Sequence, residues 1–343
     1  SWGTMAPQPD SEILRSVARY RRLVEDMDKA AVKELAQNWL RIERKLDDLI
    51  LLAAEEAAKI PAGQLVPDPM ALMRLDRYEA LKRQLDAEIR KYGDVTGRIT
   101  ERNQKEAIRL AGQGAAEQIG VLGAGFDALP VNAFESIVGQ VGGEPFRSYF
   151  LRTLTDSTLA EINQALIDGI GLGRGPRDTA EMMAKAAGLP YKRALMISRS
   201  ETLRAYRLAS IANYRHSQVV SHWMWLSAKQ TRTCISCIAK DGQVFPVEVE
   251  FVDHPQGRCA AVPVRGEKPL EREQSARQWF EAQPAAVQQK MMGGKKYAAW
   301  RGKKIALEDL SQAHHDPTFG THYGVASYEQ ALINAGQRRS GTP

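Results

Sequence analysis

Residues 233–237 read Thr-Cys-Ile-Ser-Cys, and residues 254–259 read His-Pro-Gln-Gly-Arg-Cys. These two segments hold every cysteine of the chain and one histidine: Cys234, Cys237, His254 and Cys259. Two cysteines on one tight turn, followed by a histidine and a cysteine close together, is the spacing of a tetrahedral zinc site. The residues between the two segments suffice for a short hairpin that returns the chain to the metal. The sequence therefore predicts a structural zinc, held by these four side chains, at the core of a small module.

Strand patterns surround the two segments. Residues 219–226 are β-branched and aromatic, residues 244–251 alternate apolar and acidic side chains, and residues 258–264 are again apolar. A strongly helical, basic stretch over residues 191–216 precedes them. We therefore expect a helix packed on a small antiparallel sheet, with the metal at one end.

Long helical patterns fill the first part of the chain. Apolar residues recur every three or four positions from Ser11 to about Ile60, which is the period of one helix face. Pro61-Ala62-Gly63 is predicted to end this helix, and Asp68-Pro69 to begin another with Gly93 as its C-cap. A third helical stretch runs from Asp94 to Ile119. Such lengths imply a helical partner, and a plain long helix in a bundle is favoured over a dedicated interaction arm.

A glycine-rich run, residues 169–176, interrupts the shorter helical patterns that follow. A glycine-rich turn before a helix can cradle a phosphate. No Gly-Lys-Ser/Thr ending is present and no strand pattern leads into the run, so it favours a helix–helix connection. From Glu267 the chain is polar and helical again, and its last dozen residues predict a fraying tail.

The predicted fold class is α+β and mostly helical, with a long N-terminal helical arm and a small helix-plus-antiparallel-sheet module. We divide the chain into four regions by these patterns. They are an elongated helical arm (1–125), a helical connector (126–190), the Cys/His module (191–266) and a basic helical C-terminal region with its tail (267–343).

The composition is globular, with 43% hydrophobic and 26% charged residues among 343. A net charge of +6 and a pI near 9.1 permit contact with nucleic acid without establishing it. Three cysteines beside a histidine favour a reducing compartment over a disulfide framework. The sequence contains no apolar run of 18 or more residues, so no membrane span is expected. The segment Ser1–Ala6 lacks the basic start and apolar run expected of a secretory signal.

Two basic stretches are candidates for contact with nucleic acid. Residues 191–216 carry six lysines and arginines against one acid, and residues 290–304 carry six with no acid. The alternatives, of about equal weight, are ion pairs with acidic residues of the arm or a partner, and a solvated face over buried aromatic rings. The candidate nucleic-acid-binding residues are Arg199, Arg204, Arg207, Lys295, Lys296 and Arg301.

Several residues stand in an order that is typical of one family: Arg199-Ser200-Glu201, Tyr214, Trp223, Cys234, Cys237, Asp241-Gly242, Phe245, His254-Pro255, Arg258 and Cys259. Together with the run from Trp279 to Leu310, this order resembles the phage head morphogenesis family, the phage Mu protein F-like minor head proteins. The resemblance covers roughly residues 169–310. Ser200 stands where the family usually has threonine, and Gly257 where it commonly has a further cysteine. Asp253 is then a substitute oxygen ligand.

The resemblance implies a minor structural protein of a tailed-phage or prophage head, and no enzyme. Its members associate with the portal vertex during assembly, sit inside the head and in some cases contact DNA. The expected partners are therefore the portal protein, the major capsid or scaffolding protein and double-stranded DNA, with no membrane. The expected location is the virion, inside the head near the portal vertex, and the host cytoplasm during assembly.

Two other functions stay open: a zinc-stabilised DNA-binding protein, and a metal-dependent enzyme such as a nuclease. Four protein ligands favour a structural zinc, because a catalytic zinc usually keeps one position for water. The enzyme hypothesis would regain weight if His254 or Cys259 did not bind the metal. No catalytic residue is predicted, since no nucleophile-elbow motif is visible and no partner is identifiable for the remaining histidines: His222, His314, His315 and His322.

Overall fold

The computed structural model describes residues 9–59, 76–316 and 320–340. The helix end predicted at Pro61-Ala62-Gly63 and the restart at Asp68-Pro69 therefore lie outside the described residues, as does the segment Ser1–Ala6.

The chain divides into two compact units, each built from segments that are distant in the sequence. The sheet unit comprises Ser1–Asp26, Gln104–Glu135 and Leu203–Pro343. The bundle unit comprises Met27–Asn103 and Ser136–Thr202. Three long helices contribute residues to both units: α1 (Pro9–Ala57), α3 (Asp76–Val121) and α7 (Leu189–His216). The four regions predicted along the chain stay a prediction.

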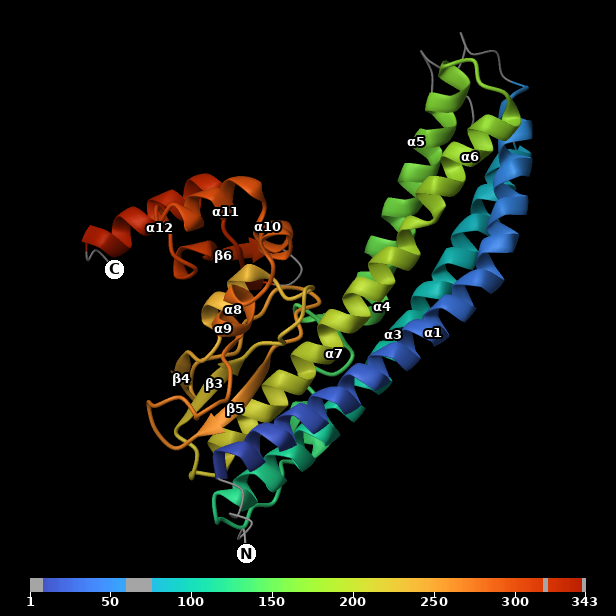
Figure 1. Cartoon of the computed structure of the whole chain (residues 1–343). Helices are drawn as coiled ribbons and strands as arrows, with labels where there is room; N and C mark the ends of the chain where they lie inside the picture. Colours follow the sequence, from blue (N-terminus) through green and yellow to red (C-terminus); the bar gives the residue numbers. More distant parts are fainter. Residues whose placement is uncertain (1–8, 60–75, 317–319, 341–343) are drawn as a thin grey trace, which may run out of the picture. The chain divides into compact units, whose positions relative to one another are not determined.

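The prediction of a long first helix is confirmed, because α1 runs from Pro9 to Ala57 (Figure 1). The helix break predicted at Gly93 is wrong, because α3 continues through this position to Val121. A Cβ atom at Gly93 would lie 3.4 Å from the Cβ atom of Phe150. The glycine therefore serves the close packing of this aromatic residue rather than the end of a helix.

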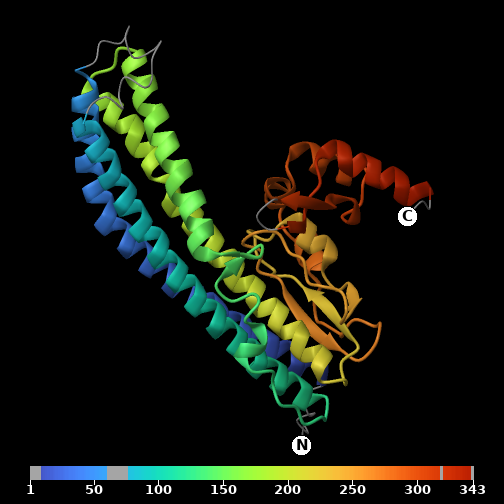
Figure 2. The same cartoon turned by 180° about the vertical axis from the view of Figure 1, so that it is seen from behind.

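The bundle unit is helical, with one small hairpin. The remaining elements between α3 and α7 are η2 (Val131–Phe134), which lies in the sheet unit, and then β1 (Gln140–Val141), β2 (Glu144–Pro145), α4 (Phe146–Phe150), the π-helical turn η3 (Leu151–Asp156), α5 (Ser157–Gly171) and α6 (Pro176–Ala187). Figures 1 and 2 show α5 and α6 side by side. The predicted helix–helix connection at residues 169–176 is thus confirmed. A Cβ atom at Gly169 would lie 2.7 Å from the side chain of Thr179, so glycine permits this close approach.

Aromatic contacts and one arginine stabilise the packing of the bundle unit. Trp39 lies between Tyr92, 5.1 Å away at the ring centroids, and Tyr191, 6.0 Å away. Arg193 donates to the carbonyl oxygen of Thr153 at 3.3 Å and to Glu161 at 2.9 Å. This arginine therefore satisfies a backbone group of the wide π-helical turn, where the ordinary helical ladder is interrupted.

A three-stranded antiparallel sheet, with β3 (His222–Leu226) at its centre, lies in the sheet unit. Its neighbours are β4 (Val244–Pro246) and β5 (Ala260–Val264), so the predicted antiparallel sheet is confirmed. The predicted extension of the second strand to Phe251 is wrong. The N–H of Val247 still donates to the carbonyl oxygen of Ser221 at 3.1 Å, but the chain then turns, and the N–H of Val249 donates to the carbonyl oxygen of Pro246 at 3.0 Å. The carbonyls beyond it accept from side chains instead, that of Val247 from Arg215 and that of Val249 from Trp223.

The sheet is buried on both faces, and alternate residues of each strand enter different cores. Met224 and Val262 pack with Ile13 and Val17 of α1. Trp223 and Trp225 pack on the other side with Tyr214 of α7 and Ile119 of α3. Their neighbours in this core include Ile211, Val247, Phe251 and Ala261. This second core also contains Cys237 and Cys259, which places the predicted metal ligands against large aromatic rings.

The C-terminal region holds more structure than the sequence predicts. Its elements are α9 (Ala276–Glu281), α10 (Ala285–Met292), α11 (Gly294–Arg301), η4 (Glu308–Leu310), the hairpin β6 (Ser311–Asp316) with β7 (Gly320–Val325), and α12 (Tyr328–Ser340). The predicted fraying tail is wrong up to Ser340, because α12 packs through Ala331 and Ala335, both 0% exposed. Small side chains allow this helix to approach its neighbours closely, which a hydropathy pattern does not reveal.

Asp309 connects η4 to α12. Its carboxylate accepts from Arg338 at 2.9 and 3.0 Å and from the N–H of Ala306 at 2.7 Å. Burial alone would raise the pKa of Asp309, but these hydrogen bonds hold it below the ordinary value of 3.8. The carboxylate therefore stabilises the fold above this ordinary value, and the contribution is lost as the pH falls through the lowered pKa.

We expect Asp309→Asn to lower the free energy of unfolding by about 1–3 kcal/mol at neutral pH, because a buried hydrogen-bonded charge is lost. Denaturant titrations of both proteins at several pH values check this. The difference should shrink as the pH falls below the ordinary value of 3.8. An equal difference at all pH values would show that the charge of Asp309 plays no part.

Candidate metal centre

The cysteines meet where β3 ends. Because β3 and β5 are antiparallel, Leu226 at the end of β3 pairs with Ala260 at the start of β5. Cys259 immediately precedes that start. The next residue after β3, Ser227, donates its hydroxyl to the carbonyl oxygen of Cys237 at 2.5 Å and lies 3.8 Å from Cys259 Sγ. Strand pairing therefore brings together two cysteines that are distant in the sequence.

The first turn of the short helix α8 (Ile235–Lys240) holds the other pair. Cys234 is its N-cap, and Cys234 Sγ accepts the N–H of Cys237 at 3.3 Å. Ile235 and Ile238 point into the core formed by the C-terminal helices. Since apolar packing fixes one side of α8, both sulfur atoms are presented on the opposite side.

The ligand atoms form two overlapping groups. In one group, the ligand atoms of Cys234, Cys237 and His254 all lie within 4.8 Å of one another. In the other, those of Cys237, Asp253 and Cys259 do so. The structure thus brings the four predicted ligands into two adjoining groups that share Cys237, and the second group includes Asp253, the substitute oxygen ligand expected from the sequence. Thiolates, imidazole and carboxylate are ligands that suit a divalent metal, and its identification as zinc stays a prediction.

His254 is oriented for binding a metal through one nitrogen. Its Nδ1 lies 2.9 Å from the carbonyl oxygen of Pro255, which can only accept, so Nδ1 carries the proton and donates. Nε2 lies 3.7 Å from Asp253 Oδ1. Metal-binding histidines commonly donate their second ring N–H to a carbonyl in this way.

The charges within the cluster are strongly coupled. A hydrogen bond from Cys237, together with the nearby His254, lowers the pKa of Cys234 to about 5 against the effect of burial. Hydrogen bonds with Cys234 and Cys259, and burial, raise the pKa of Cys237 well above 9.0. Burial alone would lower the pKa of His254, but Cys234 and Asp253 raise it to about 9. These shifts favour negative charge on Cys234 beside positive charge on His254, and binding of a metal ion would release protons from its ligands.

The candidate nucleic-acid-binding residues of α7 are engaged or partly buried. Arg199 pairs with Asp28 of the bundle unit at 2.7 Å. Arg204 is half-buried. Arg207 is 5% exposed and pairs with Asp253 at 2.9 Å. In the sheet unit, the structure therefore turns Arg207 toward the metal centre rather than toward solvent.

The C-terminal candidates differ in exposure. Lys295 and Arg301 of α11 are exposed. Lys296 is half-buried, and its Nζ donates to the carbonyl oxygen of Ala326 at 3.0 Å. Burial lowers the pKa of Lys296. Two of the three C-terminal candidates are thus available to a partner at the surface.

Sequence reasoning missed the role of Arg207 and Lys240. Arg207 follows Leu203 and precedes Ile211 at four-residue steps, so it falls within the apolar stripe of α7. That position signals a buried charge that needs an acidic partner. Lys240 is 7% exposed, and its ammonium lies 3.4 Å from the ring centroid of Tyr323 and 5.7 Å from that of Trp225. No local pattern marks this second case, because Tyr323 comes from the C-terminal hairpin.

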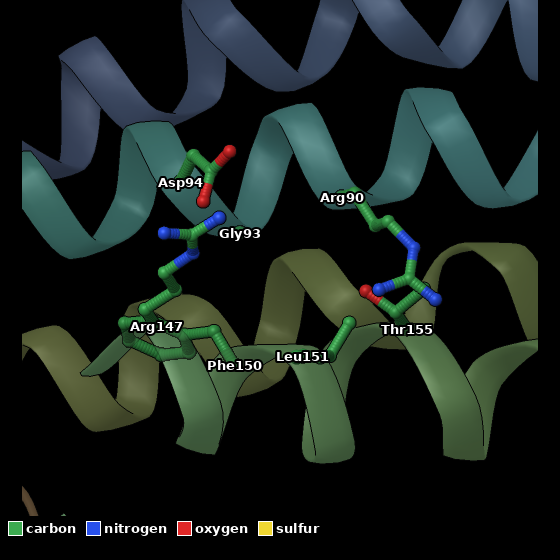
Figure 3. A pocket seen from close by; sticks show the side chains of 7 residues that line it. All are labelled: Arg90, Gly93, Asp94, Arg147, Phe150, Leu151 and Thr155. Atoms are coloured by element: carbon green, nitrogen blue, oxygen red, sulfur yellow. The ribbon is translucent and has the colours of Figure 1, made fainter. Parts of the chain in front are cut away.

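The bundle unit contains a small cavity of about 120 Å³ (Figure 3). Figure 3 shows Arg147 extending toward Asp94, and Arg90 beside Thr155. Arg90 donates to Asp86 at 2.6 Å. The lining mixes both signs of charge and contributes to neither of the metal-donor groups found in the described residues, so we assign it no function.

Residues 160–262 match the family model described as phage Mu protein F like protein. The match extends from α5 through most of β5 and includes all residues of the metal centre. No curated protein and no solved structure matches the chain. Within the described ranges, no helix has both the length and the apolar character needed to cross a membrane.

Proposed function

We propose, from the membership of residues 160–262 in the phage Mu protein F-like family of head morphogenesis proteins, that this chain is a minor structural protein of a phage head. The observation that carries the proposal is the match itself, which spans α7, the sheet and the metal centre. In more detail, we propose that the chain associates with the portal during assembly. In the virion it would lie inside the head, near the portal vertex. The alternative functions are a DNA-binding protein and a metal-dependent nuclease.

The role we propose for the metal centre is to join two apolar cores of the sheet unit. Cys237 and Cys259 lie in the core that surrounds Trp223 and Trp225. Ile235 and Ile238, on the same short helix as Cys237, lie in the core of the C-terminal helices. A bound ion would tie α8 to the start of β5, and its binding energy would become folding energy. Cys234, Cys237, His254 and Cys259 are the side chains proposed to hold it.

Association with the portal can be tested with procapsids assembled with and without the portal protein of the same phage. We expect the chain to sediment with procapsids that contain the portal and to stay in solution when the portal is omitted. Procapsids with the portal but without scaffolding protein serve as the control for the other expected partner. Equal recovery with and without the portal would contradict the portal association and indicate binding to the capsid or scaffolding protein.

Contact with double-stranded DNA is the second proposed role, and exposed charge supports it. Lys290, Lys295, Arg301, Lys303 and Lys304 are all exposed on α10, α11 and the turn that follows. The sequence has no acidic residue between Glu281 and Glu308. Clustered, exposed cations of this kind bind the phosphate backbone with a strong dependence on salt.

Charge reversal tests this role. We expect Lys295→Glu/Arg301→Glu to elute from immobilised double-stranded DNA at lower salt than the wild type. The slope of log K against log[salt] should fall by about 0.9 for each phosphate that the protein no longer neutralises. The matched control is Arg41→Glu/Arg44→Glu on α1, two exposed arginines of the bundle unit. Equal shifts in the two double variants would mean that only net charge matters, which would contradict a specific surface.

A further inference from the structure

The carboxylate of Asp253 links the metal centre to the protein interior. Its side chain is 0% exposed. Oδ1 accepts the backbone N–H of His254 at 2.9 Å and lies 3.5 Å from Cys237 Sγ. Oδ2 accepts from Arg207 at 2.9 Å. One oxygen therefore faces the cluster of ligand atoms, while the other is fixed by an ion pair.

Arg207 also binds the backbone of the loop that runs from Asp253 to Cys259. Its guanidinium also donates to the carbonyl oxygens of Gly257 and Cys259, the second at 3.0 Å. Its Cζ lies over the ring of Phe251, 5.1 Å from the ring centroid. Charge-assisted bonds of this kind are short and directional, so Arg207 sets the position of Asp253 relative to Cys259.

Gly257 leaves the space that the carboxylate of Asp253 fills. A Cβ atom at Gly257 would overlap the Asp253 carboxylate, most closely at Oδ2, the oxygen that pairs with Arg207. Gly257 does not have a positive φ. Position 257 therefore requires glycine because there is no space for a side chain, not because of its backbone conformation. Asp253 thus stands where a side chain at position 257 would project.

We propose that Arg207 positions the carboxylate of Asp253, the substitute ligand expected from the sequence, as a donor of the metal centre, with Oδ1 facing the ion beside Cys237 and Cys259. The ligand atoms of these three residues lie within 4.8 Å of one another, which is close enough for one ion. Three thiolates and one carboxylate would carry four negative charges, which a divalent ion would balance together with the buried side chains of Arg207 and Lys240. This inference rests on the proposed metal centre.

Cobalt(II) titration of the full chain tests this, because the absorption bands of bound cobalt report its donor atoms. We expect Asp253→Asn to shift these bands and to weaken cobalt binding about 10- to 100-fold, as changes around metal ligands do. The matched control is Asp309→Asn, which changes another buried, arginine-paired aspartate outside both donor groups. It should keep the bands and the affinity of the wild type.

Unchanged bands and affinity in Asp253→Asn, with cobalt bound normally by the wild type, would overturn this inference and leave the metal centre standing. A wild type that binds no cobalt would overturn both. The two failures are therefore distinguishable.

A second set of variants does not depend on the stability of Asp253→Asn. Removing the carboxylate in Asp253→Ala opens the space beside position 257, and Gly257→Cys in the same chain places a thiol there. We expect this double variant to bind cobalt at least tenfold more tightly than Asp253→Ala, with a stronger thiolate-to-cobalt absorption. Gly257→Cys alone should be less stable than the wild type because its side chain overlaps Asp253. A double variant no better than Asp253→Ala would overturn the proposal.

Discussion

Replacing Cys237 with serine is expected to abolish metal binding and to destabilise the protein more than any other single substitution at the centre. Cys237 belongs to both groups of ligand atoms and is 3% exposed. Structural zinc sites contribute on the order of 10–16 kcal/mol of binding free energy in small peptides, and this energy supports folding. We therefore expect a loss of several kcal/mol, well above the roughly 1 kcal/mol of a typical substitution. Metal analysis and thermal melting of the same sample measure both effects.

A chelator provides the control for this variant. Chelator should lower the melting temperature of the wild type to that of Cys237→Ser, and it should not change the variant. Cys234→Ser is also expected to lower stability and metal content together. Its effect should be smaller than that of Cys237→Ser, because Cys234 is half-buried and belongs to only one group of ligand atoms. If either cysteine variant melted like the wild type, the cysteines would be ordinary core residues.

Replacing Arg207 with methionine is the second large expected effect. Methionine keeps much of the length of the side chain but leaves the buried carboxylate of Asp253 without its cationic partner. Breaking a buried ion pair from one side costs about 3–5 kcal/mol, because the remaining charge stays buried. Two backbone carbonyls, those of Gly257 and Cys259, also lose their donor. Denaturant unfolding of the metal-loaded protein measures the change in free energy.

Arg109→Met is the matched control for this substitution. Arg109 pairs with Glu106 one turn away on α3, and both side chains are at least 40% exposed. Surface pairs of this kind contribute about 0–1 kcal/mol. If Arg207→Met cost no more than Arg109→Met, the buried pair would not organise the loop that carries His254 and Cys259.

The sequence predicted the elements whose signals are local. The apolar period indicated α1 and α7, and β-branched and aromatic runs indicated β3 and β5. The family resemblance is confirmed over residues 160–262. The spacing of cysteines and histidine predicted a cluster, and the structure gathers these side chains around Cys237. These predictions succeeded because the responsible residues are close in sequence or belong to one strong pattern.

Other features depend on contacts that no local pattern reveals. Gly93 has the sequence signature of a helix end, yet Phe150 requires a small residue there. The hairpin of β6 and β7 is rich in polar residues and histidine, so its strands depend on pairing with one another rather than on composition. Asp253 is itself expected from the sequence as a substitute ligand, but only the fold shows that Arg207 holds it from α7. These features depend on contacts between residues that are distant in the sequence.

The measurement that tests the central claim most directly is the metal content per chain, determined on protein purified without chelator, with Cys259→Ser as the control. A structural centre predicts about one divalent ion per wild-type chain and its loss in the variant. No metal in the wild type, or the same content in both proteins, would contradict a metal-stabilised module formed by Cys234, Cys237, His254 and Cys259.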